Sequence, residues 1–154
     1  MTVIRKATAG DEAGVIDLIK QLLFPAGGAR SESAYDWQGV ARTFREVVQD
    51  TAKGTVLVAE DDGDLIGAIT LSYPTALRYS GIYSCIEEFI TSPKARGKGV
   101  GSQLLEAVIA EANSKGCHEI QVNNPSEAGY PVYLRQGFKD IGKHLKLRLP
   151  RRDA

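Results

Sequence analysis

The sequence predicts an α/β domain of the mixed α+β kind, with about seven strands and four helices in the order β-α-α-β-β-β-α-β-α-β-β. Two patterns support this prediction: short runs of β-branched and aromatic residues, and apolar side chains spaced three or four positions apart. Three strand-like runs also follow one another in mid-chain, which favours a mixed sheet covered by helices on both faces. A length of 154 residues suits one domain, so we expect a single domain over residues 1–154.

The first half of the chain is divided by residues that cap helices or break strands. Cap residues at 8–11 precede the first predicted helix, the loop at 24–28 ends it, and Gly54 stops the second. A hairpin turn that contains Asp-Gly separates the next two strands. The predicted strands of this half lie at 3–7, 55–60 and 65–73. The first predicted helix has Val15, Leu18, Ile19 and Leu22 on one face. The second begins near residues 33–36 and has Val40, Phe44, Val47 and Val48 on one face.

The second half begins with a strand from about Gly81 to Thr91. A helix follows, because apolar side chains recur at helical spacing from Val100 onward, and Lys115-Gly116 closes it. The elements predicted after this helix are a strand at 119–123, a short helix at 130–136, two closing strands at 138–141 and 143–149, and a frayed tail at 151–154.

The composition argues against several classes of protein. A formal net charge of zero argues against a general nucleic-acid binder, and no segment approaches the ~20 apolar residues of a membrane span. The first residues lack the apolar core of a signal peptide, so we expect a cytoplasmic protein. Cys85 and Cys117 are expected to be small buried hydrophobes. Because His118 and His144 have no ligand-like spacing to a cysteine, no metal site is expected.

Three alternating glycines, Gly97, Gly99 and Gly101, lie between a predicted strand and a predicted helix. The first N–H groups of a helix have no partner within it, and the helix dipole adds partial positive charge there. Glycines leave these groups accessible, and Arg96 and Lys98 add full positive charge. The segment therefore predicts a site for phosphate or pyrophosphate. The spacing does not match a Walker loop, because Lys98 is followed by Gly99 and not by Ser or Thr. It does not match the dinucleotide fingerprint either, because Ser102 stands where the third glycine is required.

Two motifs in the second half of the chain resemble motifs of the GNAT N-acetyltransferase superfamily. The order Arg96-x-x-Gly99-x-Gly101 resembles its acyl-CoA pyrophosphate loop, and Tyr133-x-x-x-Gly137-Phe138 resembles a motif with which many members end. The order of the predicted elements is similar to the GNAT fold over nearly the whole chain.

The resemblance implies acetyl-CoA as the acetyl donor and a primary amine as the acceptor. Backbone N–H groups of the glycine loop would hold the pyrophosphate, and the end of the preceding strand would pair with the pantetheine arm like an added strand. A backbone N–H there could also stabilise the charge that develops on the thioester oxygen. At position 126 this chain has Ser126, whereas the superfamily usually has asparagine. The coenzyme-binding residues implied are Phe89, Ile90, Thr91, Arg96, Gly97, Lys98, Gly99, Val100, Gly101, Ser102, Asn123 and Ser126.

The same resemblance implies the groups that move protons. An alkyl ammonium must lose a proton before it attacks, and Glu87 matches the acidic residue that relays this proton in polyamine-type members. Glu88 is the second choice. Successive strand residues point to opposite faces, so normally only one of the two faces the cleft, although a β-bulge could change this. Tyr133 matches the tyrosine that would protonate the leaving thiolate.

The acceptor is expected to be a small-molecule amine that attacks directly in a ternary complex, near the aromatic residues Phe24, Tyr79 and Tyr83. Two alternatives remain: acetylation of a protein N-terminus or lysine, and a binding module that senses acyl-CoA without turnover. Dimers are common among the proteins that this chain resembles, so a homodimer is one expectation. No nucleic acid, membrane or metal is expected as a partner.

Overall fold

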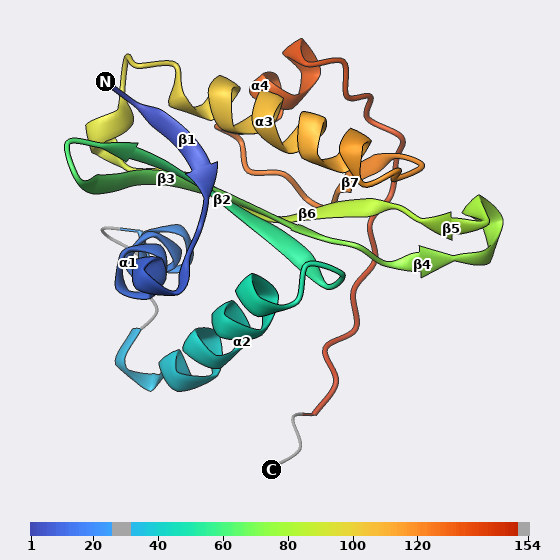
Figure 1. Ribbon diagram of the computed structural model, residues 1–154. Coiled ribbons are helices and arrows are strands. Elements are labelled where there is room, and N and C mark those ends of the chain that lie inside the picture. The colour runs from blue at the N-terminus through green and yellow to red at the C-terminus, as the bar shows by residue number, and fades with distance from the viewer. Residues whose placement is uncertain (26–31, 151–154) are drawn as a thin grey trace.

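The computed structural model describes residues 1–25 and 32–150 and has three layers (Figure 1). A five-stranded sheet in the order β1-β2-β3-β6-β7 forms the middle layer. Residues 26–28 of the predicted loop and the predicted tail at 151–154 lie outside the described residues. The strands of the sheet are β1 (Val3–Lys6), β2 (Gly54–Asp61), β3 (Asp64–Ser72), β6 (Ser84–Thr91) and β7 (Ile120–Val122).

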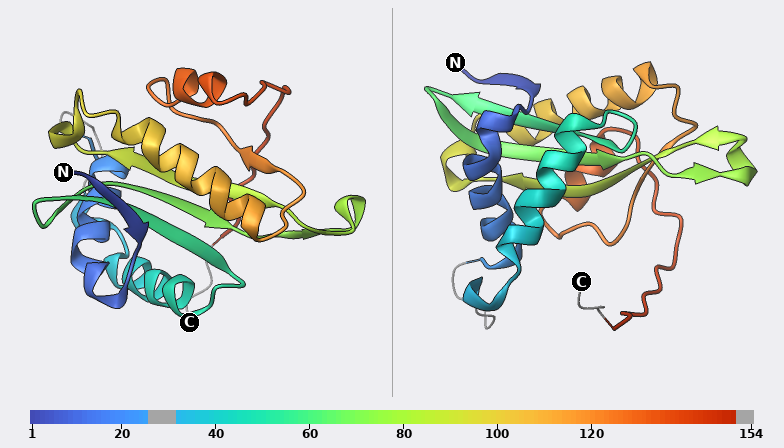
Figure 2. Two further views of the ribbon diagram at one scale, coloured as in Figure 1. Left: turned by 45° about the horizontal axis from the view of Figure 1, so that its top comes forward. Right: turned by 60° about the horizontal axis from the view of Figure 1, so that its bottom comes forward.

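Helices cover both faces of this sheet, as predicted (Figure 2). One face carries α1 (Glu12–Leu23) and α2 (Trp37–Gln49), and the other carries α3 (Val100–Ser114) and α4 (Tyr130–Arg135). Neighbouring strands are antiparallel except β6 and β7, which run parallel with α3 as the crossover between them. A parallel pair needs such a crossover, whereas antiparallel neighbours can be joined by tight turns.

Two apolar cores result from the period-two alternation of the strands. In β2, Leu57 belongs to the core under α3, whereas its neighbour Val58 belongs to the core under α1 and α2. The predicted apolar stripe of α3 is buried: Val100, Leu104, Leu105 and Val108 are each at most 1% exposed. Cys85 is a buried free cysteine, and Cys117 is half-buried.

Two predicted elements are divided in the structure. The strand predicted at 81–91 breaks at Tyr83, whose N–H donates to the Pro74 carbonyl at 3.0 Å. Its first part, β5 (Gly81–Ile82), pairs with β4 (Thr75–Ala76) in a hairpin that projects beyond the sheet (Figure 1). Ahead of α2, Glu32–Ala34 form a separate turn of 3-10 helix. The Asp36 side chain then caps α2 by accepting a hydrogen bond from the Gly39 N–H at 2.9 Å.

The prediction of closing strands at 138–141 and 143–149 is wrong. Residues 138–150 form no strand, and every residue from 139 to 150 is exposed. Apolar and polar side chains do alternate there, but a strand also needs a sheet edge beside it. In Figure 1 this segment instead leads from α4 away from the layers toward the C-terminus. The described residues still contain seven strands, the number predicted. The two missing closing strands are offset by β4 and β5, which were not predicted as separate strands.

No helix in the described part of the chain is long and apolar enough to cross a membrane.

Candidate active site

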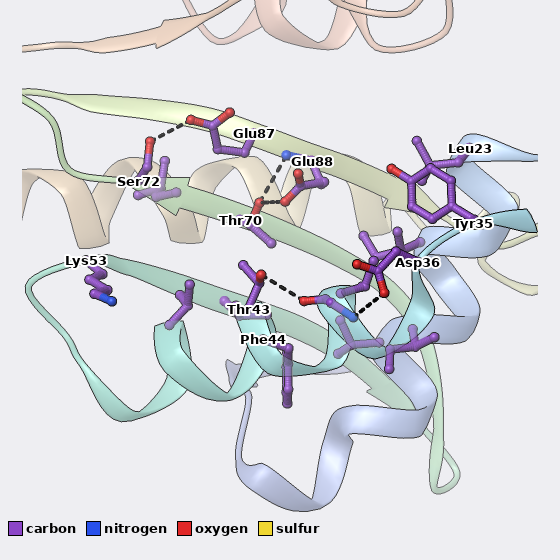
Figure 3. Close-up of a pocket in the computed structure, with 18 residues that line it drawn as sticks. Leu23, Tyr35, Asp36, Thr43, Phe44, Lys53, Thr70, Ser72, Glu87 and Glu88 are labelled. Carbon is purple, nitrogen blue, oxygen red and sulfur yellow. Dashed lines mark hydrogen bonds between the residues drawn. The ribbon is translucent and has the colours of Figure 1, made fainter. Parts of the chain in front are cut away.

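A β-bulge in β6 turns two consecutive acidic side chains toward the same face of the sheet. Thr70 pairs with Glu88 and Leu71 pairs with Ile86, so Glu87 is the extra residue between them. The Glu87 and Glu88 carboxylates accept hydrogen bonds from two hydroxyl groups of β3, Ser72 Oγ at 2.6 Å and Thr70 Oγ1 at 2.5 Å (Figure 3). Of the two expectations for this strand, regular alternation with one acid in the cleft does not hold, and the β-bulge that could change the facing is present.

Both carboxylates line a cavity of about 530 Å³ between β3, β6 and the helices α1 and α2 (Figure 3). Its apolar wall comes mainly from the two helices, and its polar groups come from both layers. The lining residues are Val15, Ile16, Ile19, Leu23, Tyr35, Asp36, Gly39, Val40, Thr43, Phe44, Val47, Lys53, Val56, Thr70, Leu71, Ser72, Glu87 and Glu88. An apolar cavity with a few convergent polar groups is the usual form of a small-molecule site.

Sequence reasoning missed several polar residues of this cavity, among them Thr70, Ser72 and Asp36. Thr70 and Ser72 alternate with the apolar residues Ile69 and Leu71, and this alternation was a signal that one face of the strand is polar. Asp36 was recognised only as part of a helix start. Its position in the cavity depends on how α2 packs, which the sequence pattern does not give.

The environment of Glu88 changes its acidity. Burial raises the pKa of Glu88 because the charged form loses hydration, and the nearby charge of Glu87 raises it further. The hydrogen bond from Thr70 opposes this effect by stabilising the carboxylate. Glu88 also anchors the backbone, since its N–H donates to Thr70 Oγ1 at 3.0 Å. The result is a carboxylate that is a stronger base than an exposed one.

Strands β6 and β7 pair only over a short length. Their parallel register ends at Ile86 opposite Val122, whereas β6 continues to Thr91. In the part of the chain that the structure describes, Phe89, Ile90 and Thr91 therefore have a strand neighbour on the β3 side alone. Their other side can accept the amide groups of an extended ligand.

Tyr133 lies on the opposite side of the sheet from the cavity, within the core under α3. Its ring contacts Phe89 of β6 at 5.6 Å and Phe138 at 5.3 Å between centroids. Burial raises the pKa of its phenol, with a smaller contribution from Cys85. Asn123, at the end of β7, donates through Nδ2 to Cys85 Sγ at 3.9 Å. Cys85, whose pKa burial raises to about 11, stays a thiol at neutral pH.

The glycine loop leads from β6 into α3. Gly97 and Gly99 have φ values of 78° and 68°, and a Cβ atom at either would meet nothing within 4 Å. The Gln103 N–H donates to the Gly99 carbonyl at 3.1 Å, so the N–H groups of Val100, Gly101 and Ser102 precede the helical pattern. The loop therefore combines open space with backbone donors at the start of a 15-residue helix.

The charged side chains of this loop differ in their partners. Lys98 forms an ion pair with Asp61, at the end of β2, with 2.5 Å between Nζ and Oδ2. Arg96 is exposed and lines a smaller cavity of about 200 Å³ together with Thr91, Ser92 and Pro93. A Cβ atom placed on Gly101, the second residue of α3, would lie 3.5 Å from the Cζ atom of Phe89. The loop and the end of β6 are thus in direct contact.

The remaining predicted residues lie outside the main cavity. Ser126 accepts a hydrogen bond from the Gly129 N–H at 3.0 Å and so helps to begin α4. Phe24 packs edge-on against Tyr35, a cavity-lining residue. Tyr79 and Tyr83 contact each other on the β4–β5 hairpin side of the molecule and are not among the lining residues. Within residues 1–25 and 32–150, no cluster of acidic, histidine or cysteine side chains could hold a metal ion.

Comparisons with known proteins identify relatives over most of the chain. A family model described as acetyltransferase (GNAT) family matches residues 18–138. An uncharacterized N-acetyltransferase, YhfO of Bacillus subtilis, is 29% identical over an alignment of 141 residues that covers 89% of this chain and 89% of that protein. The aminoalkylphosphonate N-acetyltransferase of Salmonella typhimurium is 28% identical over 138 residues, covering 88% of this chain and 84% of that protein.

A solved structure has the same fold. It is that of a predicted acetyltransferase with acetyl-CoA from Clostridium acetobutylicum. The TM-score is 0.81 at 24% identity, with 96% of each chain covered.

Proposed function

Because the chain belongs to the GNAT family of acetyltransferases, we propose that it transfers an acetyl group from acetyl-CoA to the primary amine of a small molecule. The observation that carries this proposal is the pair of carboxylates, Glu87 and Glu88, in one cavity beside the side of β6 that has no strand neighbour beyond Ile86 among the described residues. Acidic groups in a mainly apolar cavity suit an ammonium group on a small carbon skeleton. A relative that acts on aminoalkylphosphonates supports an acceptor of this size.

Glu88 is our choice for the group that accepts the proton of the ammonium, directly or through a water molecule. The resemblance alone favoured Glu87, but Glu88 is the more buried carboxylate and has the raised pKa. A base is most effective when its pKa approaches the working pH. Glu87, exposed and held by Ser72, would contribute negative charge that attracts the ammonium into the cavity.

The neutral amine then attacks the carbonyl carbon of the thioester. A C–N bond forms, the C–S bond breaks, the sulfur leaves as a thiolate, and the nitrogen releases its surplus proton to solvent. Tyr133 would donate its phenolic proton to this sulfur and later regain one from solvent. The raised pKa of Tyr133 keeps the phenol protonated at neutral pH.

Acetyl-CoA supplies the activated acetyl group. The backbone N–H groups between Gly97 and Ser102 would hold its pyrophosphate, since the loop offers space and donors at a helix N-terminus. The backbone of Phe89, Ile90 and Thr91 would pair with the pantetheine amides along the side of β6 that β7 leaves uncovered. A backbone N–H in this stretch could also stabilise the oxygen of the reacting carbonyl.

A thiol-release assay tests the proposal. We expect coenzyme A release from acetyl-CoA only when an amine is present, across a panel of diamines, aminosugars, aminoalkylphosphonates and a peptide with a free N-terminus. The Glu88→Gln variant should lose about 10²–10⁴-fold in kcat, whereas Glu106→Gln, a carboxylate on the exposed side of α3, should retain full activity.

Two results would contradict the proposal. A strong preference for the peptide over every small amine would identify a protein acetyltransferase. Tight binding of acetyl-CoA without turnover of any amine would identify a non-catalytic binding module.

A further inference from the structure

The turn between β2 and β3, at residues 61–64, holds both lysines that flank Arg96. Lys98 of the glycine loop pairs with Asp61, the last residue of β2, and Lys94 pairs with Asp64, the first residue of β3. The turn and the loop lie at the same end of the sheet (Figure 1). Arg96 forms no ion pair with any described residue. Two carboxylates are thus placed beside a loop that, in the proposed function, binds an anion.

The two ion pairs differ in their exposure to water. Lys98 Nζ lies 2.5 Å from Asp61 Oδ2, and the Asp61 side chain is only 13% exposed. Lys94 Nζ lies 3.4 Å from Asp64 Oδ2, and the Asp64 side chain is 65% exposed. Water weakens an exposed ion pair. Lys98 also lowers the pKa of Asp61, so this carboxylate is charged at neutral pH. Asp61 therefore holds its lysine more firmly than Asp64 does.

Lys98 can nevertheless exchange its partner. Its side chain is 46% exposed, and it stands between Gly97 and Gly99, which both have open space beside the backbone. The Asp61 carboxylate also has a second cation, because the N-terminal ammonium of Met1 lies 3.2 Å from its Oδ1. Lys98 can therefore turn toward an anion while Asp61 keeps a partner. A diphosphate is a favourable alternative partner for an ammonium group.

We propose that Asp61 is a positioning residue that competes with the diphosphate of the coenzyme for Lys98 and so limits how tightly the loop binds coenzyme A. This inference rests on the proposed function, in which the loop holds acetyl-CoA. Binding would replace one ion pair of Lys98 by another, so that the lysine adds little net affinity. Limited affinity favours turnover, because the product coenzyme A must leave the same loop after each acetyl transfer.

Calorimetric titration with coenzyme A tests the competition. Asp61→Asn frees Lys98 for the diphosphate, so the dissociation constant should fall by about three- to tenfold. Asp64→Asn is the matched control, since it makes the same change of charge in the same turn; it should alter the dissociation constant by less than about twofold. Asp61→Glu keeps the competing charge and should bind coenzyme A as the unaltered chain does.

Two further measurements test whether the gain depends on Lys98 and on the diphosphate. In a Lys98→Gln background, Asp61→Asn should change the dissociation constant by less than about twofold, because the shared partner is gone. Dephospho-coenzyme A, which keeps the diphosphate and lacks the 3′-phosphate, should show the same gain as coenzyme A. Circular dichroism and thermal unfolding check that each variant folds.

Unchanged or weaker binding of coenzyme A by Asp61→Asn overturns the inference. A gain of equal size in the Lys98→Gln background would reveal a general effect of charge and overturns it too. A gain that is lost with dephospho-coenzyme A would place Lys98 at the 3′-phosphate and contradicts competition for the diphosphate. If neither the unaltered chain nor any variant binds coenzyme A, the proposed function itself is contradicted.

Discussion

Thr70 lowers the pKa of Glu88 and Glu87 raises it. These opposite effects give a test at the scale of single residues. Catalysis by Glu88 requires the deprotonated form, so kcat/KM should fall as the pH falls through its raised pKa. Thr70→Val removes the hydrogen bond that lowers this pKa, and the acidic limb should move to higher pH. Glu87→Gln removes a charge that raises it, and the limb should move to lower pH.

The measurement is the pH profile of kcat/KM for the two variants and the unaltered chain. Shifts of the same sign in both variants, or no acidic limb, would exclude Glu88 as the titrating base. In the Glu88→Gln variant the limb should disappear.

Tyr133 can be tested separately because Phe preserves its packing against Phe89 and Phe138. We expect Tyr133→Phe to lower kcat by about 10²-fold or more, while the KM for acetyl-CoA stays within about threefold, because only the proton donor is lost. Tyr130→Phe on the same helix is the control, since the Tyr130 hydroxyl bonds to Asp140 at the surface. Equal kcat values in both variants would remove Tyr133 from the mechanism.

At the scale of elements, we expect coenzyme binding at the glycine loop to depend on open space beside the backbone more than on the backbone strain that a substitution causes. Gly99→Ala places a side chain in the left-handed region and beside the proposed pyrophosphate site. Gly63, in the β2–β3 turn, also has a positive φ of 83° and open space around it, so Gly63→Ala is a control for strain. Each variant should lose about 1–2 kcal/mol of stability, but only Gly99→Ala should raise the KM for acetyl-CoA, by about tenfold or more. Equal KM values would argue against binding at this loop.

Arg5 of β1 and Asp11 at the start of α1 hold the first strand and helix together. Their side chains form two hydrogen bonds, at 2.8 and 2.9 Å, and Asp11 also accepts one from the Thr8 N–H. The Arg5 guanidinium lowers the pKa of Asp11 to about 2. Stability from a lowered carboxylate pKa is present above the unfolded value and is lost as the pH falls toward the folded value.

Asp11→Asn should therefore lower the free energy of unfolding by about 1–2 kcal/mol at pH 7, because solvent partly screens the Arg5 guanidinium and weakens the ion pair. Its effect should shrink as the pH falls from about 4 to about 2. Urea titrations at several pH values measure this. The control Asp64→Asn affects a more exposed ion pair with Lys94 and should change stability little. A pH-independent loss in Asp11→Asn would contradict an ionic origin.

At the scale of the whole molecule, the expectation of a homodimer predicts that stability depends on protein concentration. The midpoint of thermal unfolding should rise with protein concentration for a dimer, because dissociation accompanies unfolding. A flat dependence, measured by calorimetry over about a hundredfold range of concentration, would contradict a dimer that dissociates on unfolding.

The fold class was predictable because most of its signals are local. Helical spacing in α3 and the Asp-Gly turn between β2 and β3 need only neighbouring residues. The bulge at Glu87 was not predictable in the same way, because it is a property of the pairing between β3 and β6. Residues 143–149 illustrate the same limit: apolar and polar side chains alternate there, but the segment forms no strand, because a strand also needs a neighbouring sheet edge that the local pattern does not supply. For the candidate site, the glycine motif indicated the loop, whereas Thr70, Ser72 and Asp36 required the packed layers.

The bulge also sets how many acids β6 presents to the cavity. Ile86 and Phe89 both pack in the core under α3, so the residues between them face the opposite side of the sheet, where the cavity lies. Removing either Glu87 or Glu88 would restore the regular alternation of β6 and leave one carboxylate facing the cavity instead of two. A single codon deletion could thus halve the negative charge offered to an ammonium group while the sheet stays intact, and a count of residues across this strand would distinguish the two kinds of site.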